Sequence, residues 1–516
     1  MSVNHLEANS VAKGTVQIAL TNAIQYLVIG LFYVIVTRTG ALTQTQLGIL
    51  SVLFFLASTF SIFTELALST ALTKFTSENL GKDRPKEAAA IQKTVTRTVL
   101  TLSLAGFAVA TFSSRSLSQY FWNEPAYAPL IILMFGLAFL SNLRAVYISG
   151  LQALRLFGKM AAVALIFIVL SRFIAAALAL LQLGIPGVLA GYMGGSILAL
   201  VAAIIFTRGR LPNPSNNAPL KPLLHFSWPL FLSSLTLLIL NQIDLVIIAS
   251  LTSDYALVGI YYIVINSIAV FSVIWTPIMT TLFPVLSARY GLQDPEGVSN
   301  IIKTASRYLI YITLPTCMGL VAMAPTALTF FYGPSYTPGA TPLAILSIAT
   351  ITIALYTLFT TTLTAVGKTK EVLKINIVSA LSLIIALLSL VPPLEAVGAA
   401  TARLIVQVIS LTLATHLLRK NIRVQLDKEA IWKSATASTV TLFSLLALEW
   451  TLRTKIPATH LLPTEILTAL CIYLFSLYIL KALNSQDFQL LGQALPKHFA
   501  KYLKYLEKIF THQHSG

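Results

Sequence analysis

The stretch from Leu223 to Ile268 reads LLHFSWPLFLSSLTLLILNQIDLVIIASLTSDYALVGIYYIVINSI. It opens like a membrane helix and then carries a charge, Asp244, where a lipid-facing helix could not hold one. An Asp inside a membrane span costs roughly 2.5 to 3.5 kcal/mol on insertion scales, so such a residue normally faces a partner, a water-filled cavity or an ion. The stretch therefore predicts a membrane helix with a buried acid, and it begins where the second half of the chain starts to repeat the first.

Composition indicates that the whole chain is a membrane protein. Of its 516 residues, 56% are hydrophobic and only 10% are charged, whereas soluble domains have about 25% charged residues. The net charge of +17 does not indicate a nucleic-acid partner, because Lys and Arg occur in short segments between apolar runs. Both cysteines, Cys317 and Cys471, lie in apolar stretches, so we predict no disulfide, no metal site and no cofactor.

Hydropathy predicts an all-α protein with fourteen transmembrane helices. A helix needs about 20 apolar residues to cross about 30 Å of hydrocarbon. Runs of this kind fall approximately at 15–37, 47–73, 91–113, 128–152, 160–181, 185–207, 226–251, 256–286, 302–323, 341–365, 371–391, 396–418, 434–452 and 462–482. The tail at 484–516 alternates apolar residues with Lys and is typical of an amphipathic helix on the inner leaflet.

The first twelve helices are predicted to form two lobes of six. The lobes cover 1–208 and 223–420, a Pro- and Asn-rich cytoplasmic linker at 209–222 joins them, and two further helices follow at 421–483. Glycines recur at offsets of 209 to 211 residues: Gly48 with Gly259, Gly158 with Gly367, and Gly187 with Gly398. Because six is an even number, both lobes enter from the same side, which predicts a parallel repeat with a cavity between the lobes.

Basic residues predict the orientation, since short cytoplasmic loops are enriched in Lys and Arg. The loops after the even-numbered spans hold sixteen basic residues: Lys74, Lys82, Arg84, Lys86, Arg155, Lys159, Arg208, Arg210, Lys221, Arg289, Lys368, Lys370, Arg419, Lys420, Arg423 and Lys428. The opposite loops hold little beyond Arg38, Arg115, Arg453 and Lys455. The polar start, Met1 to Lys13, shows no apolar segment of the signal-peptide type, so we expect the first span to remain in the protein. We therefore expect a multi-pass protein of the plasma membrane with both termini in the cytoplasm.

Several short motifs follow one another in a fixed order. The first span ends at Arg38-Thr39-Gly40, and Leu47-Gly48 comes soon after it. Phe331-Tyr332-Gly333 precedes the tenth span, and Gly367-Lys368 is followed by the segment Pro392 to Ala400. In order and spacing these motifs resemble those of the polysaccharide transporter family. The members of this family are the Wzx-type flippases of the multidrug/oligosaccharidyl-lipid/polysaccharide (MOP) exporter superfamily.

This resemblance implies a carrier and not an enzyme. The carrier would turn a lipid-linked oligosaccharide over from the cytoplasmic to the outer leaflet by alternating access, for surface polysaccharide or glycoprotein biosynthesis. Its partners would be this cargo, membrane lipids and glycan-assembly proteins. A polyprenyl phosphate or pyrophosphate cargo has an anionic group, a hydrated sugar chain and a long apolar tail. Its carrier therefore needs cationic side chains in a wet cavity and an opening for the tail.

Two other functions stay open. A MATE-like multidrug or cation exporter has the same superfamily fold, although such exporters usually have twelve spans and an acidic or aromatic cavity. A membrane glycan polymerase or ligase would be expected to place acids or a His on sizeable external loops. The external loops here are short and nearly free of acids, with Glu124, Asp254 and Glu395 isolated.

Three arginines are candidate cargo contacts. Arg172 lies near the middle of the fifth span, where a guanidinium group binds either a phosphate of the cargo or carbonyl groups of its own lobe. Arg38 ends the first span. Its side chain either extends to the lipid headgroups or, as the family motif implies, contacts the cargo. Arg144 and Glu65 lie at similar depth in the fourth and second spans, which favours a structural ion pair between them.

Asp244 has two interpretations. It pairs with Arg403, which lies at comparable depth in the twelfth span, or it couples transport to an ion. By resemblance to the peptidoglycan-precursor flippases, Asp244 and Asn376 match parts of a sodium site, but Ala380 stands where that site has a second acid. The coupling ion, Na⁺ or H⁺, is therefore left open.

Overall fold

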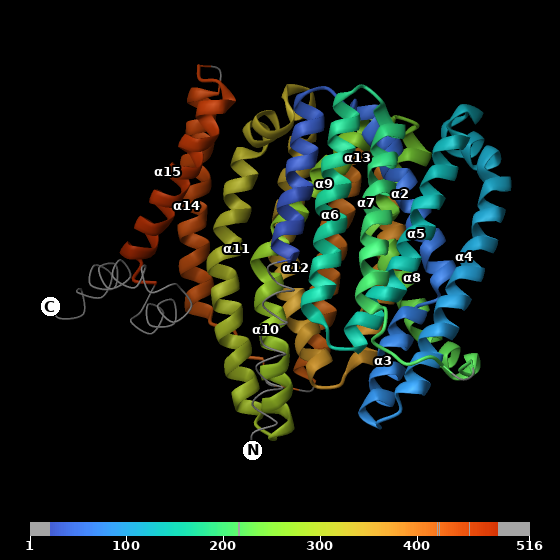
Figure 1. The fold of residues 1–516 in the computed structure, drawn as a ribbon. Helices are drawn as coiled ribbons and strands as arrows, with labels where there is room; N and C mark the ends of the chain where they lie inside the picture. Colours follow the sequence, from blue (N-terminus) through green and yellow to red (C-terminus); the bar gives the residue numbers. More distant parts are fainter. Residues whose placement is uncertain (1–20, 215–216, 421, 423, 454, 483–516) are drawn as a thin grey trace.

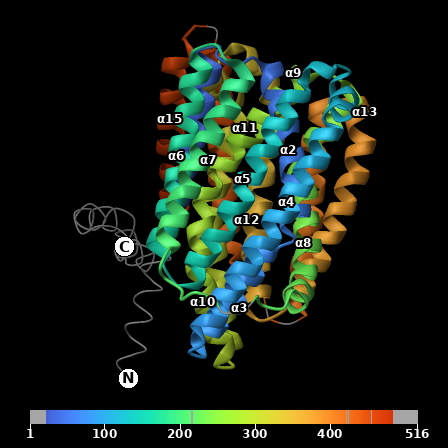
Figure 2. The ribbon, with the colours of Figure 1, turned by 45° about the vertical axis from the view of Figure 1, so that its right-hand side comes forward.

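The computed structural model of the protein describes residues 21–214, 217–420, 422, 424–453 and 455–482. Every regular element within these ranges is a helix, and most of the helices run side by side in one bundle (Figures 1 and 2). The polar start and the tail at 484–516 lie outside the described residues.

The helices begin with one over Thr21–Arg38. They continue as α2 (Gln44–Glu65), α3 (Leu68–Gly81), α4 (Pro85–Trp122), α5 (Ala128–Ala153), α6 (Phe157–Leu180), α7 (Gly184–Thr207), α8 (Leu220–Thr252), α9 (Tyr255–Val270), α10 (Ser272–Gly291), α11 (Pro295–Tyr332), α12 (Ala340–Ala365), α13 (Thr369–Arg419), α14 (Lys428–Leu452) and α15 (Ala458–Ile479). Short 3-10 helices lie at Pro125–Tyr127 and Pro334–Gly339.

Within the described residues, twelve helices are long and apolar enough to cross a membrane, and thirteen spans result if the bent pair α9 and α10 counts as one. The run predicted at 47–73 is divided into α2 and α3, because Leu66 and Ala67 adopt left-handed backbone angles with φ of 50° and 55°. The run predicted at 256–286 is likewise bent, by 43°, between α9 and α10. Hydropathy alone could not show either break.

The long helix α13 is a hairpin. Glu395 has non-helical angles, φ 50° and ψ −126°, and the chain reverses there. The hydroxyl groups of Ser379 and Ser410 are 2.6 Å apart although 31 residues separate them in the sequence. A side chain at Gly398 would meet the Leu390 carbonyl oxygen, since an ideal Cβ there lies 2.0 Å from it. The glycine therefore lets the two arms of the hairpin pack together. These arms correspond to the spans predicted at 371–391 and 396–418.

Helices α2 and α9 cross with their backbones in contact. An ideal Cβ on Gly48 would lie 2.0 Å from the Tyr255 carbonyl oxygen, and one on Gly259 would lie 1.9 Å from the Gln44 carbonyl oxygen. Only glycine permits this approach without displacing backbone atoms. The crossing joins the two halves of the chain at positions that the sequence pairs in its repeat.

The two C-terminal helices lie at one side of the bundle. Helices α14 and α15 pack against each other and against α11, away from α4 at the opposite side (Figure 1). Buried Tyr311 of α11 and Tyr473 of α15 mark this contact, since the Tyr473 hydroxyl donates to the Tyr311 carbonyl oxygen at 2.9 Å.

Candidate functional site

A cavity of 520 Å³ lies between α8 and the helices α2, α5, α6 and α7. Because α8 opens the second half of the chain, the cavity lies between the two halves. Its wall combines apolar side chains with a cation and several neutral polar groups: Ser58, Ser61, Ser141, Arg172, Asn241 and Gln242. Such a wall can bind both a hydrated group and an anion.

Arg172 is positioned in this wall by the close packing of α6 and α7. An ideal Cβ on Gly191 would lie 2.3 Å from the backbone nitrogen of Ala175, and one on Gly195 would lie 2.5 Å from that of Ser171. The two helices therefore touch along this glycine face. Arg172 follows Ser171 directly, so the contact fixes where its side chain leaves the helix.

The guanidinium group of Arg172 rests on aromatic rings. Its carbon lies 4.2 Å from the centre of the Tyr192 ring and 5.5 Å from that of the Phe32 ring. These distances suit cation–π contacts, which hold a cation without neutralising it. The buried Nε of Arg172 has no hydrogen-bond partner among the described residues. The ring contacts thus hold the guanidinium group beside the cavity.

The ion pair predicted between Arg144 and Glu65 is not formed within the part of the chain that the structure describes. The guanidinium carbon of Arg144 lies 3.5 Å from the centre of the Phe167 ring instead. On the same helix, Asn142 Nδ2 donates to Thr64 Oγ1 at 2.7 Å, so Asn142 marks the face of α5 that meets α2. Arg144 is two residues further on, about 200° around the helix, and therefore points away from Glu65.

Arg38 joins the two halves of the chain and is not part of the cavity wall. Its Nε donates to the Phe330 carbonyl oxygen at 2.9 Å, and its Nη2 contacts the same atom. Beside it, Gln44 Nε2 donates to the Ser335 carbonyl oxygen at 2.6 Å. Arg38 therefore bridges the end of the first helix and the end of α11.

Asp244 is fully buried and contacts Arg403. The Nε of Arg403 lies 2.5 Å from Asp244 Oδ2, and the Tyr261 hydroxyl donates to the same oxygen at 3.1 Å. Arg403 Nη2 also donates to the Asn241 carbonyl oxygen at 2.9 Å. The expected contact between Asp244 and Arg403 is thus present, and it links α8, α9 and α13. An ion-coupling role for these residues stays a prediction.

Asn376 does not join this cluster. Its Oδ1 accepts a hydrogen bond from the Tyr356 hydroxyl at 2.8 Å. Ser379 and Ser410 are level with each other in the two arms of α13. Asn376 lies three residues from this level in one direction and Arg403 lies seven in the other, so roughly 15 Å of helix rise separates them. The structure therefore does not bring Asn376 to Asp244.

The tyrosines near Arg172 were not predicted. Besides Tyr192, the hydroxyl groups of Tyr33 and Tyr262 are 2.5 Å apart and connect the first helix to α9. A tyrosine inside an apolar span needs a partner for its hydroxyl group, which is the signal that could have marked these residues. The sequence does not show which residue is the partner of each hydroxyl group, since 229 residues separate Tyr33 from Tyr262.

A second, strongly apolar cavity of 340 Å³ lies between the first helix and α9, α11 and α12. Its wall includes Leu27, Leu31, Val270, Phe271, Leu320 and Phe331. Several of these side chains are exposed on the outside of the bundle, among them Leu27 and Leu31. An apolar chain is the ligand that such a wall favours.

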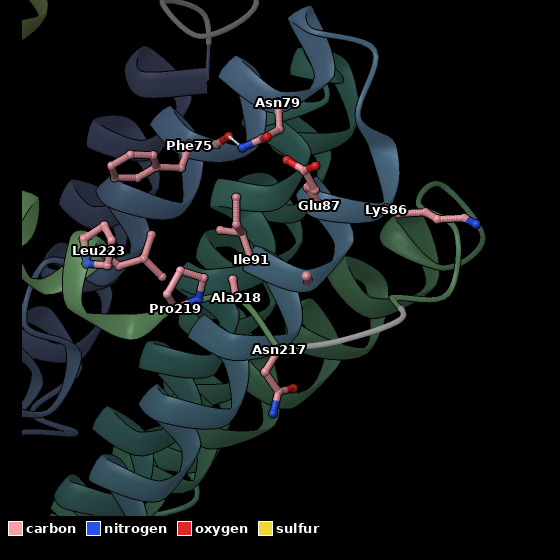
Figure 3. Close-up of a pocket in the computed structure, with 11 residues that line it drawn as sticks. Phe75, Asn79, Lys86, Glu87, Ile91, Asn217, Ala218, Pro219 and Leu223 are labelled. Atoms are coloured by element: carbon pink, nitrogen blue, oxygen red, sulfur yellow. Dashed lines mark hydrogen bonds between the residues drawn. The ribbon is translucent and has the colours of Figure 1, made fainter.

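A third cavity, of 420 Å³, belongs to the linker and not to either of these sites. It lies where the linker meets α3 and α4, and Figure 3 shows Ala218 and Pro219 beside Ile91. The Ala218 backbone nitrogen donates to Thr94 Oγ1 at 2.9 Å, which fastens the linker to α4. Lys86 extends away from the other lining residues (Figure 3), so this cavity offers no inward-facing cation.

A family model described as "Polysaccharide biosynthesis protein" matches residues 11–289, more than half of the chain. The chain belongs to the polysaccharide biosynthesis protein family. Among curated relatives, "Probable flippase AglR" of Haloferax volcanii is 25% identical over 289 residues, which cover 54% of this chain and 59% of that protein. The match therefore spans less than two thirds of the length of that relative.

Solved structures show the same fold. A structure named "Lipid II flippase MurJ, inward closed conformation" aligns with a TM-score of 0.73 and 16% identity, covering 89% of this chain and 97% of that one. An inward-facing multidrug resistance MATE family transporter of the MOP superfamily aligns with a TM-score of 0.60 and 16% identity, over 77% and 96% of the two chains. This member of the polysaccharide biosynthesis family is thus a multi-pass membrane protein with the fold of MOP superfamily transporters.

Proposed function

We propose that this protein moves an oligosaccharide linked to polyprenyl phosphate or pyrophosphate from the cytoplasmic to the outer leaflet of the plasma membrane by alternating access. The observation that carries the proposal is the position of Arg172. Its cationic group borders the cavity between the two halves, and no carboxylate of the described residues pairs with it. Phosphate is the anionic part of such a cargo, and a guanidinium group can bind it through two parallel hydrogen bonds.

The rest of the cavity wall suits the sugar part of the cargo. Serine hydroxyl groups from α2 and α5 and the amides of Asn241 and Gln242 from α8 line it. These neutral groups both donate and accept hydrogen bonds, as sugar hydroxyl groups do. Because they come from both halves of the chain, relative movement of the halves would change how they contact a bound sugar.

The apolar cavity suits the polyprenyl tail. It lies between the first helix and helices of the second half, so a tail held there could remain in lipid while the head group enters the bundle. Burial of the apolar tail would stabilise the complex by about 25 cal/mol per Å² of buried surface. This contribution would be the same for cargoes that differ only in their sugars. Specificity would then depend on the polar cavity alone.

The proposed topology has fourteen crossings, with both termini in the cytoplasm and two six-helix lobes related by a parallel repeat. Division of the α13 hairpin at Glu395 adds one crossing to the thirteen spans counted with α9 and α10 as a bent pair. The contact between Gly48 and Gly259 supports the repeat, since related positions meet at an axis between the halves. Glycan-assembly proteins are the expected partners on either side of the membrane.

Export of a drug or cation is the second candidate function, and the fold shared with a MATE family transporter favours it. The cationic side chain beside the cavity argues against a cationic substrate, because a positive ligand would be repelled by Arg172. Catalysis by a polymerase or ligase has less support, since the relative with a matching sequence is named as a flippase.

Reconstitution tests the proposed function. Vesicles containing the purified full-length protein would carry a polyprenyl diphosphate bearing a fluorescent oligosaccharide in both leaflets, and an impermeant quencher would be added outside. The protein should raise the quenched fraction from that of the outer leaflet towards completeness. An unchanged quenched fraction with folded, inserted protein would contradict the proposal. Uptake of a cationic dye by the same vesicles would favour the exporter instead.

A further inference from the structure

Two glutamates are buried in the C-terminal helix pair, away from the cavity that Arg172 borders. Glu449 lies in the last turn of α14, and Glu465 lies in the second turn of α15. Glu465 has 0% of its surface exposed and Glu449 has 7%. Because α14 and α15 pack against each other and against α11, protein encloses both carboxyl groups.

Glu449 has two polar neighbours. The Thr326 hydroxyl of α11 donates to Glu449 Oε2 at 2.7 Å. Arg453, one turn further along, places its Nε 3.6 Å from Glu449 Oε1, and about half of its side chain is exposed. Glu449 therefore has a hydrogen-bond donor at one carboxyl oxygen and a cation near the other.

Glu465 has no such support. Both of its carboxyl oxygens are buried, and no described residue donates a hydrogen bond to either. Its hydrogen-bonding neighbour is the carboxyl group of Glu449 on the packed helix α14, and Oε1 of that group is likewise buried without a donor. Two ionised carboxyl groups only accept hydrogen bonds, whereas a protonated one can donate to the other. The contact is therefore favourable only when a proton lies between the two groups.

We propose that Glu449 and Glu465 share one bound proton and form a proton-binding site in the C-terminal helix pair. The charged groups that face Glu465 are Glu449 and Arg453, while α11 presents the neutral Thr326. With one proton bound, this group of side chains is neutral overall. Without the proton it carries an uncompensated negative charge that is enclosed by protein, which is strongly unfavourable. The site goes beyond the proposed flippase function and does not depend on it.

The geometry favours a proton over a metal ion. Within the described residues, no group of three or more His, Cys, Asp or Glu side chains could hold a metal. Two carboxyl groups in direct contact that share one proton are an established arrangement in proteins.

The site lies beside a contact between the two halves of the chain. Thr326 precedes Phe330 by four residues, about one turn of α11, and the Phe330 carbonyl oxygen accepts the hydrogen bond from Arg38. The bound proton keeps Glu465 and Glu449 in contact and so stabilises α14 and α15 against this end of α11. Its release would weaken that packing next to the Arg38 contact.

Infrared spectroscopy of the full-length protein in lipid nanodiscs tests the site, since a protonated carboxyl group absorbs apart from a carboxylate. At neutral pH, the difference between wild type and Glu465→Gln should contain one carboxylic acid band, and alkaline pH should remove it. Glu449→Gln should keep the band at a shifted frequency, because Glu465 would then face an amide. Glu78→Gln is the matched control: Glu78 is exposed and pairs with Lys82 at 2.6 Å, so the band should not change.

Stability gives a second, independent measurement. If the folded chain holds a proton that the unfolded chain releases, thermal stability falls as pH rises, and Glu465→Gln removes this decline because it mimics the protonated form. Identical carboxylic acid bands and identical pH profiles in wild type and Glu465→Gln would overturn the proposal. A band that Na⁺ abolishes, with a rise in stability, would assign a cation site and overturn it equally. None of these measurements involves transport, so they leave the flippase proposal unaffected.

Discussion

Arg403 Nε lies 2.5 Å from Asp244 Oδ2 in the interior of the second half of the chain. Asp244 is fully enclosed, and the same oxygen accepts the Tyr261 hydroxyl at 3.1 Å. The pair therefore joins α8, at the start of the second half, to the second arm of α13. Because two charges have been removed from water, each requires the other.

Replacement of either partner should destabilise the protein strongly. Asp244→Asn or Arg403→Gln leaves one buried charge without compensation, which typically costs about 3 to 5 kcal/mol. The double variant should cost less than the two single variants together, since neither charge remains. Thermal unfolding of all four proteins in one detergent, evaluated as a double-mutant cycle, measures this coupling.

An exposed ion pair provides the matched control for this cycle. Arg289 and Asp294 are 3.0 Å apart with side chains that are 54% and 34% exposed, so their removal should change stability by about 0 to 1 kcal/mol. Strict additivity for Asp244 and Arg403 would show that the contact is not a stabilising pair. Asp244 would then be available for ion binding.

The glycine crossing of α2 and α9 predicts a steric effect. Gly48→Ala and Gly259→Ala each place a methyl group within about 2 Å of a carbonyl oxygen of the other helix, so the helices must separate. We expect each variant to lose about 1 to 3 kcal/mol of stability, as overpacked sites do. Thermal unfolding measures the loss. Gly81→Ala is the control, because its Cβ would have open space around it, and it should leave stability nearly unchanged. A loss of stability in Gly81→Ala equal to that in the other two variants would contradict the backbone contact.

The proposed orientation predicts labelling from opposite sides of the membrane. Single cysteines at Asn213 in the linker and at Ser335 beside α11 should react with an impermeant reagent from the cytoplasmic and the external side, respectively. Both residues are exposed, and the background would lack Cys317 and Cys471. The physical basis is the concentration of Lys and Arg at the linker end of the bundle. Labelling of both cysteines from one side would rule out this topology.

The helical fold could be predicted because apolar runs of about 20 residues have few alternatives in a membrane. The breaks could not, since the left-handed angles of Leu66 and Ala67 follow from packing and not from hydropathy. The close approach at Gly48 and Gly259 was visible only as a repeated position, because glycine has many uses in membrane helices. That these two glycines allow α2 and α9 to touch is visible only in the folded structure.

The site was predictable where a charge interrupts an apolar span. Arg172 and the contact of Asp244 with Arg403 follow from the cost of burying a charge without a partner. Arg144 shows the limit of this reasoning, since depth in the membrane does not fix the face of the helix, and the neighbouring ring of Phe167 had no signal in the sequence. Glu465 was missed because its partner lies on another helix and near a span end.

Substitution of Arg172 gives the most direct test of the cargo contact. Arg172→Ala removes the cation beside the cavity and should abolish movement of the lipid-linked oligosaccharide. Arg172→Lys keeps the charge but loses the two-pronged hydrogen bonding and the planar stacking on Tyr192, so transport should fall only in part. The quencher assay in vesicles measures the rate for each variant, alongside the amount of folded protein that is inserted.

Arg115→Ala is the matched control for these variants, because Arg115 is exposed at the end of α4 and borders none of the described cavities. It should transport as the wild type does, which separates loss of a particular arginine from loss of net charge. Full transport by Arg172→Ala would eliminate the cargo role. Poor folding of both Arg172 variants would instead assign Arg172 to the packing of α6 on Tyr192 and Phe32. The aromatic contacts hold the guanidinium group in place without neutralising it, so transport should be far more sensitive than stability to its removal.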